Sequence, residues 1–122
     1  MTGERTLTVR VRTVPEAVVV VAAGDLDLGS APVLRERARA VLDDRPDALI
    51  VDLGAIGFCG SAGLQVLAEL VAATAAGGVP LAVVADHYPV VRVVRLSRLD
   101  EAFTLHATVD AACDWIRRRP QR

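Results

Sequence analysis

Four consecutive valines, Val18–Val21, constrain the fold more than any other feature of the chain. They lie within "AVVVVAAG" (Ala17–Gly24), in which every residue before the glycine is apolar. A strand with one face in water alternates apolar and polar residues, so this unbroken β-branched run predicts a strand covered on both faces. Such strands are typical of parallel sheets packed between helices.

The rest of the pattern alternates strands with helices in the order β-β-α-β-α-β-α-β-α. Further strands are expected at Leu7–Arg12, Ala48–Leu53, Pro80–Ala85 and Phe103–Leu105, and helices over about 30–42, 64–76, 90–96 and 109–118. Alternation of this kind predicts an α/β fold with a mostly parallel sheet of four to five strands, in which the first two strands are antiparallel. At 122 residues the chain is expected to be one domain over 1–122, with a core of about 6–118.

Charge and composition exclude several classes of function. The formal net charge is −1, and the basic cluster "RRRPQR" at the C-terminus is the only one, so the chain lacks the electrostatic footprint of a nucleic-acid-binding protein. We interpret that cluster as the solvated end of the last helix, where cations suit the helix dipole; an anionic membrane surface is the alternative. The first residues are too charged for a signal peptide, and no apolar run could be inserted across a membrane.

The cysteines indicate neither a disulfide framework nor a metal site. Cys59 and Cys113 are too few and too unpatterned for either, and a reducing cytoplasm is the expected location. The phosphate-binding patterns G-x-x-x-x-G-K-[ST] and G-x-G-x-x-G are both absent from the sequence, so no motif supports intrinsic ATP hydrolysis. We expect no cofactor.

Two predicted loops leave the carboxyl ends of neighbouring strands. They are "GDLD" (Gly24–Asp27) and "GAIGFCGSAG" (Gly54–Gly63). In parallel sheets these ends share one edge, where functional loops gather. We therefore expect Asp25, Asp27 and Ser61 to be neighbours in space.

Ser61 lies between two glycines, Gly60 and Gly63, just before a helical pattern in "FCGSAGLQVL". One interpretation is structural: the serine caps the helix and contributes about 1 kcal/mol. The other is functional. The two glycines leave the backbone amides uncrowded, and helix N-termini favour anions, so a phosphate on Ser61 could be held without unfolding the domain.

The segment "VDLGAIGFCGSAGLQVL" resembles the signature of the STAS domains, specifically of the anti-sigma factor antagonists. "GDLD" is similar to the Gly-Glu-Leu-Asp loop of that family, and "VVRVVRLSRLDEAF" is similar to its third-helix region. The resemblance extends over nearly the whole chain and keeps the order of elements. There are two departures: Gly60 replaces the usual aspartate, and Ala62 replaces a second serine.

The resemblance implies a phosphorylation switch. Ser61 corresponds to the serine that an anti-sigma factor, itself a serine kinase, phosphorylates in that family; a PP2C-type phosphatase is the implied opposing partner. The unphosphorylated form would bind the anti-sigma factor and release its sigma factor. The implied partner-binding residues are Gly24, Asp25, Asp27, Cys59, Gly60, Ala62, Gly63, Leu64 and Gln65, whereas Val66, Leu67 and Leu70 are assigned to the core.

Two other classes of function are alternatives to this interpretation: an enzyme and a STAS subunit that does not switch. An enzyme of the G-x-S-x-G type would need glycine at Cys59, and Ser61 lies well beyond the expected strand end at Leu53. His87 or His106 could act as a base, with Asp100 or Asp110 to orient it, but we expect no catalysis. The third class is a STAS subunit that does not switch, such as those of lipid-transport complexes.

Cys59 also has two interpretations. A thiol near the N-terminus of a helix can be activated for redox chemistry. The apolar neighbours Ile56 and Phe58 favour a packed, unreactive side chain instead.

Overall fold

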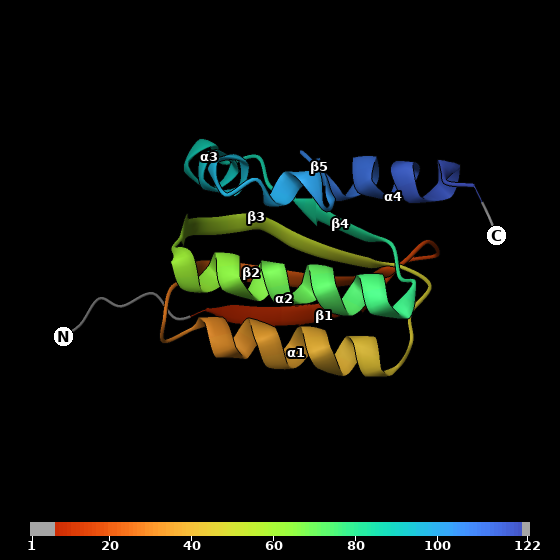
Figure 1. Ribbon diagram of the computed structural model, residues 1–122, viewed down its shortest axis with the longest axis horizontal. Coiled ribbons are helices and arrows are strands. Elements are labelled where there is room, and N and C mark those ends of the chain that lie inside the picture. The colour runs from red at the N-terminus through yellow and green to blue at the C-terminus, as the bar shows by residue number, and fades with distance from the viewer. Residues whose placement is uncertain (1–6, 121–122) are drawn as a thin grey trace.

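The computed structural model describes residues 7–120, so Thr6, at the start of the expected core, and Gln121 and Arg122, at the end of the basic cluster, lie outside the described range. The elements follow the predicted order (Figure 1). They are β1 (Thr8–Thr13), β2 (Val18–Leu26), α1 (Ala31–Asp43), β3 (Leu49–Cys59), α2 (Ser61–Gly77), β4 (Leu81–Val84), α3 (Tyr88–Leu96), a 3-10 turn (Leu99–Glu101), β5 (Thr104–His106) and α4 (Val109–Arg118).

The five strands form one sheet in the order β1-β2-β3-β4-β5. β1 pairs with β2 antiparallel, and each later strand pairs parallel with the strand before it. The predicted mixed sheet with one antiparallel hairpin is therefore confirmed. The valine run explains its centre, because Val19 and Val20 are fully buried in a strand with neighbours on both sides.

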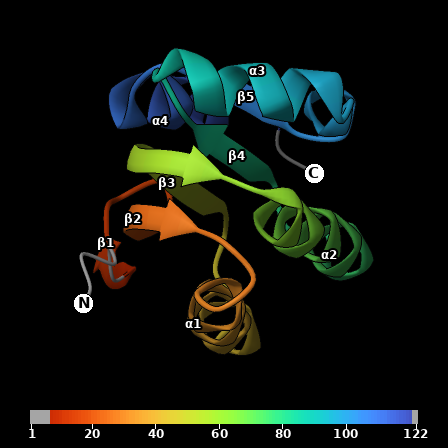
Figure 2. The same ribbon diagram turned by 90° about the vertical axis from the view of Figure 1, so that its left-hand side faces the viewer.

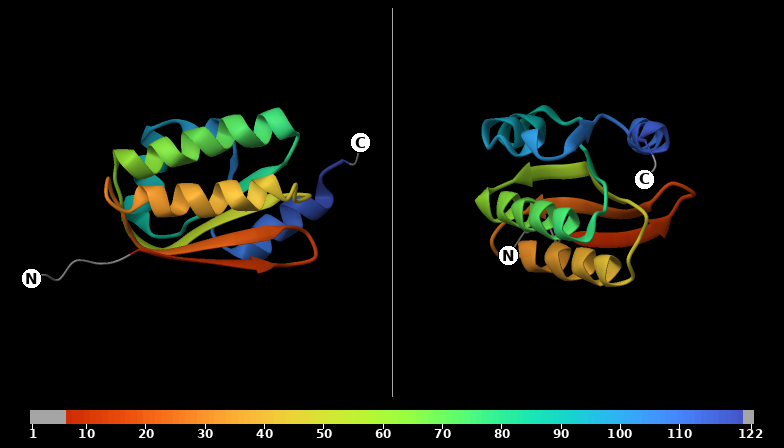
Figure 3. Two further views of the ribbon diagram at one scale, coloured as in Figure 1. Left: turned by 90° about the horizontal axis from the view of Figure 1, so that it is seen from below. Right: turned by 45° about the vertical axis from the view of Figure 1, so that its right-hand side comes forward.

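Two separate cores cover the two faces of the sheet. The larger contains the inward faces of α1, α2 and α3, including Leu34, Leu67 and Val90. The smaller packs Ala112 and Cys113 of α4 against the opposite face. Each parallel pair of neighbouring strands is joined by one helix, and such crossovers are nearly always right-handed. The three connecting helices therefore lie on the same face of the sheet, which explains why there are two cores. α1 and α2 lie side by side on one face of the sheet (Figure 3).

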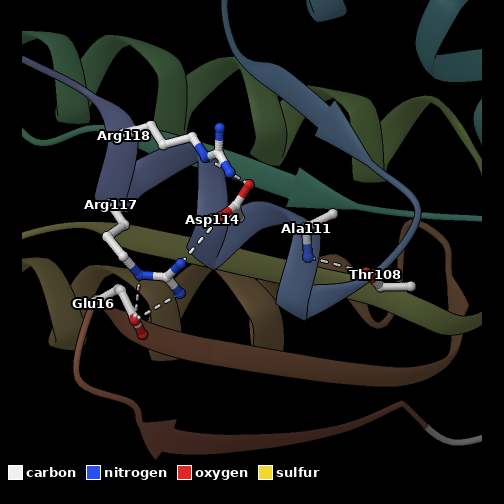
Figure 4. Close-up of polar contacts among 6 residues, drawn as sticks. All are labelled: Glu16, Thr108, Ala111, Asp114, Arg117 and Arg118. Atoms are coloured by element: carbon white, nitrogen blue, oxygen red, sulfur yellow. Dashed lines mark hydrogen bonds and ion pairs between the residues drawn. The ribbon is translucent and has the colours of Figure 1, made fainter.

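Side-chain ion pairs tie together the amino edge of the sheet, the edge at which the parallel strands begin. Arg117 of α4 donates to Glu16 in the β1–β2 turn at 3.1 Å and to Asp114 at 3.0 Å (Figure 4). Arg118 donates to the other oxygen of Asp114 at 2.9 Å. The hydrogen bond from Arg117 lowers the pKa of Glu16. The basic end of the last helix thus connects the helix to the hairpin as well as facing solvent.

No helix within residues 7–120 has the length and apolar character needed to cross a membrane.

Candidate functional site

The site is built on a two-stranded extension of the sheet. Pairing of β3 with β4 ends at Asp52, whereas pairing of β2 with β3 continues to Leu26 and Cys59. The register shifts twice along this extension, and Gly24 has a φ of 118° that only glycine adopts readily. The ends of β2 and β3 and the starts of α1 and α2 face the viewer in Figure 2. We call this the carboxyl edge.

The predicted loops at Gly24–Asp27 and Gly54–Gly63 are therefore wrong in part. β2 extends to Leu26 and β3 to Cys59, so Ser61 follows its strand after a single residue instead of lying far beyond Leu53. Glycines give this segment a poor strand propensity. Pairing between the two extensions and burial of Leu26, Ile56 and Cys59 override that propensity.

Ser61 is the first residue of α2 and does not cap it. The N-cap is Gly60, whose carbonyl accepts from the N–H groups of Gly63 at 3.0 Å and Leu64 at 3.2 Å. The Ser61 side chain is exposed and makes no capping hydrogen bond. In the described part of the chain the N–H groups of Ser61 and Ala62 have no acceptor, as is usual at a helix start. The structural interpretation of Ser61 as a cap is therefore wrong.

The two glycines around Ser61 allow close packing beneath it. A Cβ at Gly63 would lie 2.9 Å from the Cys59 Sγ and 3.0 Å from the Leu26 Cβ. A Cβ at Gly60 would lie 3.2 Å from the ring of Phe58. Glycine at these positions lets the first turn of α2 approach both strands, and it leaves the Phe58 ring beside the helix start.

The segments that carry Asp25, Asp27 and Ser61 lie together, as predicted. Asp25 pairs with Phe58 across the extension, and the Gly60 N–H donates to the Leu26 carbonyl at 2.9 Å. Asp27 also has a structural role. Its Oδ1 accepts from the Ser30 N–H at 2.9 Å, and the Ser30 hydroxyl accepts from the Asp27 N–H at 3.0 Å.

Ser30 is the N-cap residue of α1, but its side chain does not cap the helix; its hydroxyl donates to the Asp25 carbonyl at 2.7 Å. The loop between β2 and α1 is therefore held by its own side chains.

Cys59 packs beneath the site. Its side chain is 5% exposed, and burial raises the pKa of the thiol to about 11. A thiol with this pKa is protonated at neutral pH, which favours the packed interpretation over redox chemistry. Gly63 is buried as well, so both residues lie beneath the surface that carries Ser61.

Along α2, Leu64 is half-buried and Gln65 is exposed, while Val66, Leu67 and Leu70 are buried as predicted. Gln65 donates to Glu69 at 3.4 Å, and Glu69 accepts two hydrogen bonds from Arg35 of α1, at 2.7 and 3.2 Å. The hydrogen bond from Arg35 lowers the pKa of Glu69. This pair fixes α2 relative to α1.

Sequence reasoning did not assign three apolar residues that the structure exposes at the carboxyl edge. Leu28, Phe58 and Tyr88 are 84%, 54% and 71% exposed, and each lies at or just after the end of a parallel strand. Phe58 and Tyr88 line a groove of about 420 Å³ together with Cys59, Pro89, Arg92 and Val93. Their position was the signal available in the sequence, because large apolar residues stand here where polar loop residues are common.

Comparison with known proteins agrees with this geometry. Residues 8–112 match the STAS domain family. The chain is 33% identical over 117 residues to the anti-sigma-F factor antagonist RsfB of Mycobacterium tuberculosis, an alignment that covers 96% of this chain and 95% of RsfB. It is 34% identical to an anti-sigma factor antagonist from Mycobacterium paratuberculosis of known crystal structure, with a TM-score of 0.82 over 92% of this chain and 95% of that one.

A third structure shares the fold at lower identity. The phosphorylated form of the Bacillus cell fate determinant SpoIIAA has a TM-score of 0.68 and 19% identity, over 89% of this chain and 99% of that one.

The chain therefore belongs to the STAS domain family. Its similarity to RsfB over nearly the whole chain places it among the anti-sigma factor antagonists of that family, which are non-enzymatic regulators.

Proposed function

We propose that the unphosphorylated chain binds an anti-sigma factor that is a serine kinase, and that phosphorylation of Ser61 by this kinase switches binding off. The observation that supports this most is the state of Ser61 itself. Its hydroxyl is exposed at the first position of α2, with no capping role in the fold. A kinase could therefore modify it without breaking a structural contact.

The surroundings of Ser61 support a switch that acts at the surface. The backbone on both sides is fixed by the Gly60–Leu26 hydrogen bond and by the packing of Gly63 on Cys59. A phosphate adds about −1.5 to −2 charges and three acceptor oxygens. Desolvating that charge against a partner costs several kcal/mol, and even about 3 kcal/mol weakens binding roughly 100-fold.

The proposed partner surface comprises Ser61 and the residues around it. Asp25 and Asp27 would add negative charge beside a phosphate, which strengthens repulsion from an acidic partner surface. Gly24, Gly60, Ala62, Leu64 and Gln65 complete the surface, with Cys59 and Gly63 beneath it. A PP2C-type phosphatase in the cytoplasm would restore the binding form.

The experiment is intact-mass analysis of the chain after incubation with ATP and each purified anti-sigma kinase of its own organism. We expect a gain of one phosphate, absent in Ser61→Ala. Ser97→Ala is the matched control, because Ser97 is also exposed but its hydroxyl donates to the Val94 carbonyl at 2.6 Å. This variant should gain phosphate like the wild type. No phosphorylation by any kinase would favour the interpretation as a non-switching STAS subunit. The presence of Gly60 in place of aspartate would then be the first explanation to test.

A further inference from the structure

The groove between the end of β3 and α3 has features of a docking site that the phosphorylation switch does not require. It is lined by Phe58, Cys59, Tyr88, Pro89, Arg92 and Val93 and encloses about 420 Å³. Phe58 and Tyr88, both more than half exposed, form its apolar walls. Exposed aromatic side chains beside a depression are common features of protein–protein contact surfaces.

The groove also carries positive charge. Arg92 lines it, and Arg95 follows one turn later on the exposed face of α3. Within residues 7–120 neither arginine has an acidic group within 4.0 Å, whereas Arg98, just beyond the helix, pairs with Glu101 at 3.0 Å. Arginine is enriched at interfaces because its planar guanidinium pairs well with carboxylates.

The groove is continuous with the start of α2. The ring of Phe58 lies 3.2 Å from the position that a Gly60 Cβ would occupy, and Gly60 immediately precedes Ser61. A partner that covers Ser61 therefore meets Phe58 as well. On the other side of Ser61, Asp25 near the end of β2 and Asp27 in the β2–α1 loop carry negative charge, whereas Arg92 and Arg95 carry positive charge on α3.

We propose that this groove receives an acidic segment of the anti-sigma factor, with an apolar side chain placed between Phe58 and Tyr88 and a carboxylate paired with Arg92. The inference rests on the proposed function and names a second contact of the same partner. The opposite charges on the two sides of Ser61 would fix the orientation of the partner, because like charges across an interface disfavour the reversed arrangement.

The test is the dissociation constant, by isothermal titration calorimetry, for the purified anti-sigma kinase that binds the wild-type chain. Phe58→Ala and Arg92→Glu should each weaken binding about 10-fold, since buried aromatic and arginine contacts dominate interfaces. Arg12→Glu is the matched control: Arg12 is exposed on β1 near the amino edge, and the same charge reversal there should change affinity less than about twofold. Urea unfolding of each variant reports whether the fold is intact.

Each outcome bears on the proposal. Wild-type affinity in both Phe58→Ala and Arg92→Glu would overturn the groove as a docking site and leave the Ser61 switch standing. An equal loss of affinity in Arg12→Glu would show that binding responds to the net charge of the chain alone, which also overturns the groove as a docking site. A wild-type dimer in sedimentation equilibrium that Phe58→Ala dissociates would assign the groove to a second copy of this chain instead. If no anti-sigma factor binds the wild type, the proposed function fails first, and this inference fails with it.

Discussion

The two edges of the sheet use their polar side chains in opposite ways. At the amino edge, Arg117 and Arg118 pair with Glu16 and Asp114 and connect α4 to the hairpin. At the carboxyl edge, Ser61 and Arg92 have no such partner within residues 7–120. Around Ser61 the backbone performs the structural role, through the Gly60–Leu26 hydrogen bond and the close approach of Gly63 to both strands, whereas the neighbouring β2–α1 loop is held by Asp27 and Ser30.

This difference separates stability from recognition. Where side chains are satisfied by one another, the surface is less available to a partner; where the backbone holds the fold, side chains remain free for recognition. Substitutions at the amino edge should therefore change stability and leave binding unaffected. At the carboxyl edge, substitutions of Ser61 and Arg92, which make no such contact within residues 7–120, should behave in the reverse way.

The largest change in stability is expected at Gly63. Gly63→Ala places a methyl group 2.9 Å from the Cys59 Sγ, and overpacking of this kind should lower the free energy of unfolding by about 2 kcal/mol. In Gly77→Ala, in the same helix, the new Cβ lies 3.7 Å from Val79, which is an ordinary van der Waals contact. This substitution should raise the free energy of unfolding by about 0.5 kcal/mol. Urea unfolding measures both. Equal effects of the two substitutions would show that the carboxyl edge does not depend on backbone approach.

A smaller effect is expected at Asp27. Asp27→Ala removes the acceptor for the Ser30 N–H and should cost about 1 kcal/mol of unfolding free energy, whereas Asp27→Asn keeps an oxygen at that position and should cost little. Thermal unfolding compares the two variants. If Asp27→Asn is as unstable as Asp27→Ala, the charge of Asp27 and not its hydrogen bond stabilises the loop.

The smallest effect is a pH dependence at the amino edge. Because Arg117 holds the pKa of Glu16 below its ordinary 4.5, the stabilising contribution of Glu16 is fully present above pH 4.5. It is lost as the pH falls below 4.5 through the folded-state pKa. The difference in unfolding free energy between wild type and Glu16→Gln should therefore shrink between pH 6 and pH 3. A difference that stays constant between pH 6 and pH 3 would contradict the assignment.

Much of the fold could be predicted from the sequence because its strongest patterns are local. The valine run predicted a strand covered on both faces, and Val66, Leu67 and Leu70 of α2, which were assigned to the core, are buried. The juxtaposition of Asp25 with the segment before Ser61 followed from parallel topology alone. Nearly all of the element order depends on such signals.

The remaining features depend on contacts between distant segments. The ends of β2 and β3 contain Gly24, Gly54 and Gly57, which weaken any strand pattern, and only their mutual pairing makes them strands. The exposure of Phe58 and the position of Arg92 beside it depend on how α3 packs beside β3, which periodicity does not encode. The site was therefore predicted around Ser61, and the groove beside it was missed.

The most direct test of the central claim is the affinity of the chain for its anti-sigma factor before and after stoichiometric phosphorylation of Ser61. Calorimetry should show that the phosphate weakens binding on the order of 100-fold, while Ser61→Ala binds like the unmodified chain. Equal affinity of the phosphorylated and unmodified forms would contradict the switch. It would instead identify this chain as a STAS subunit whose partner binding is independent of Ser61.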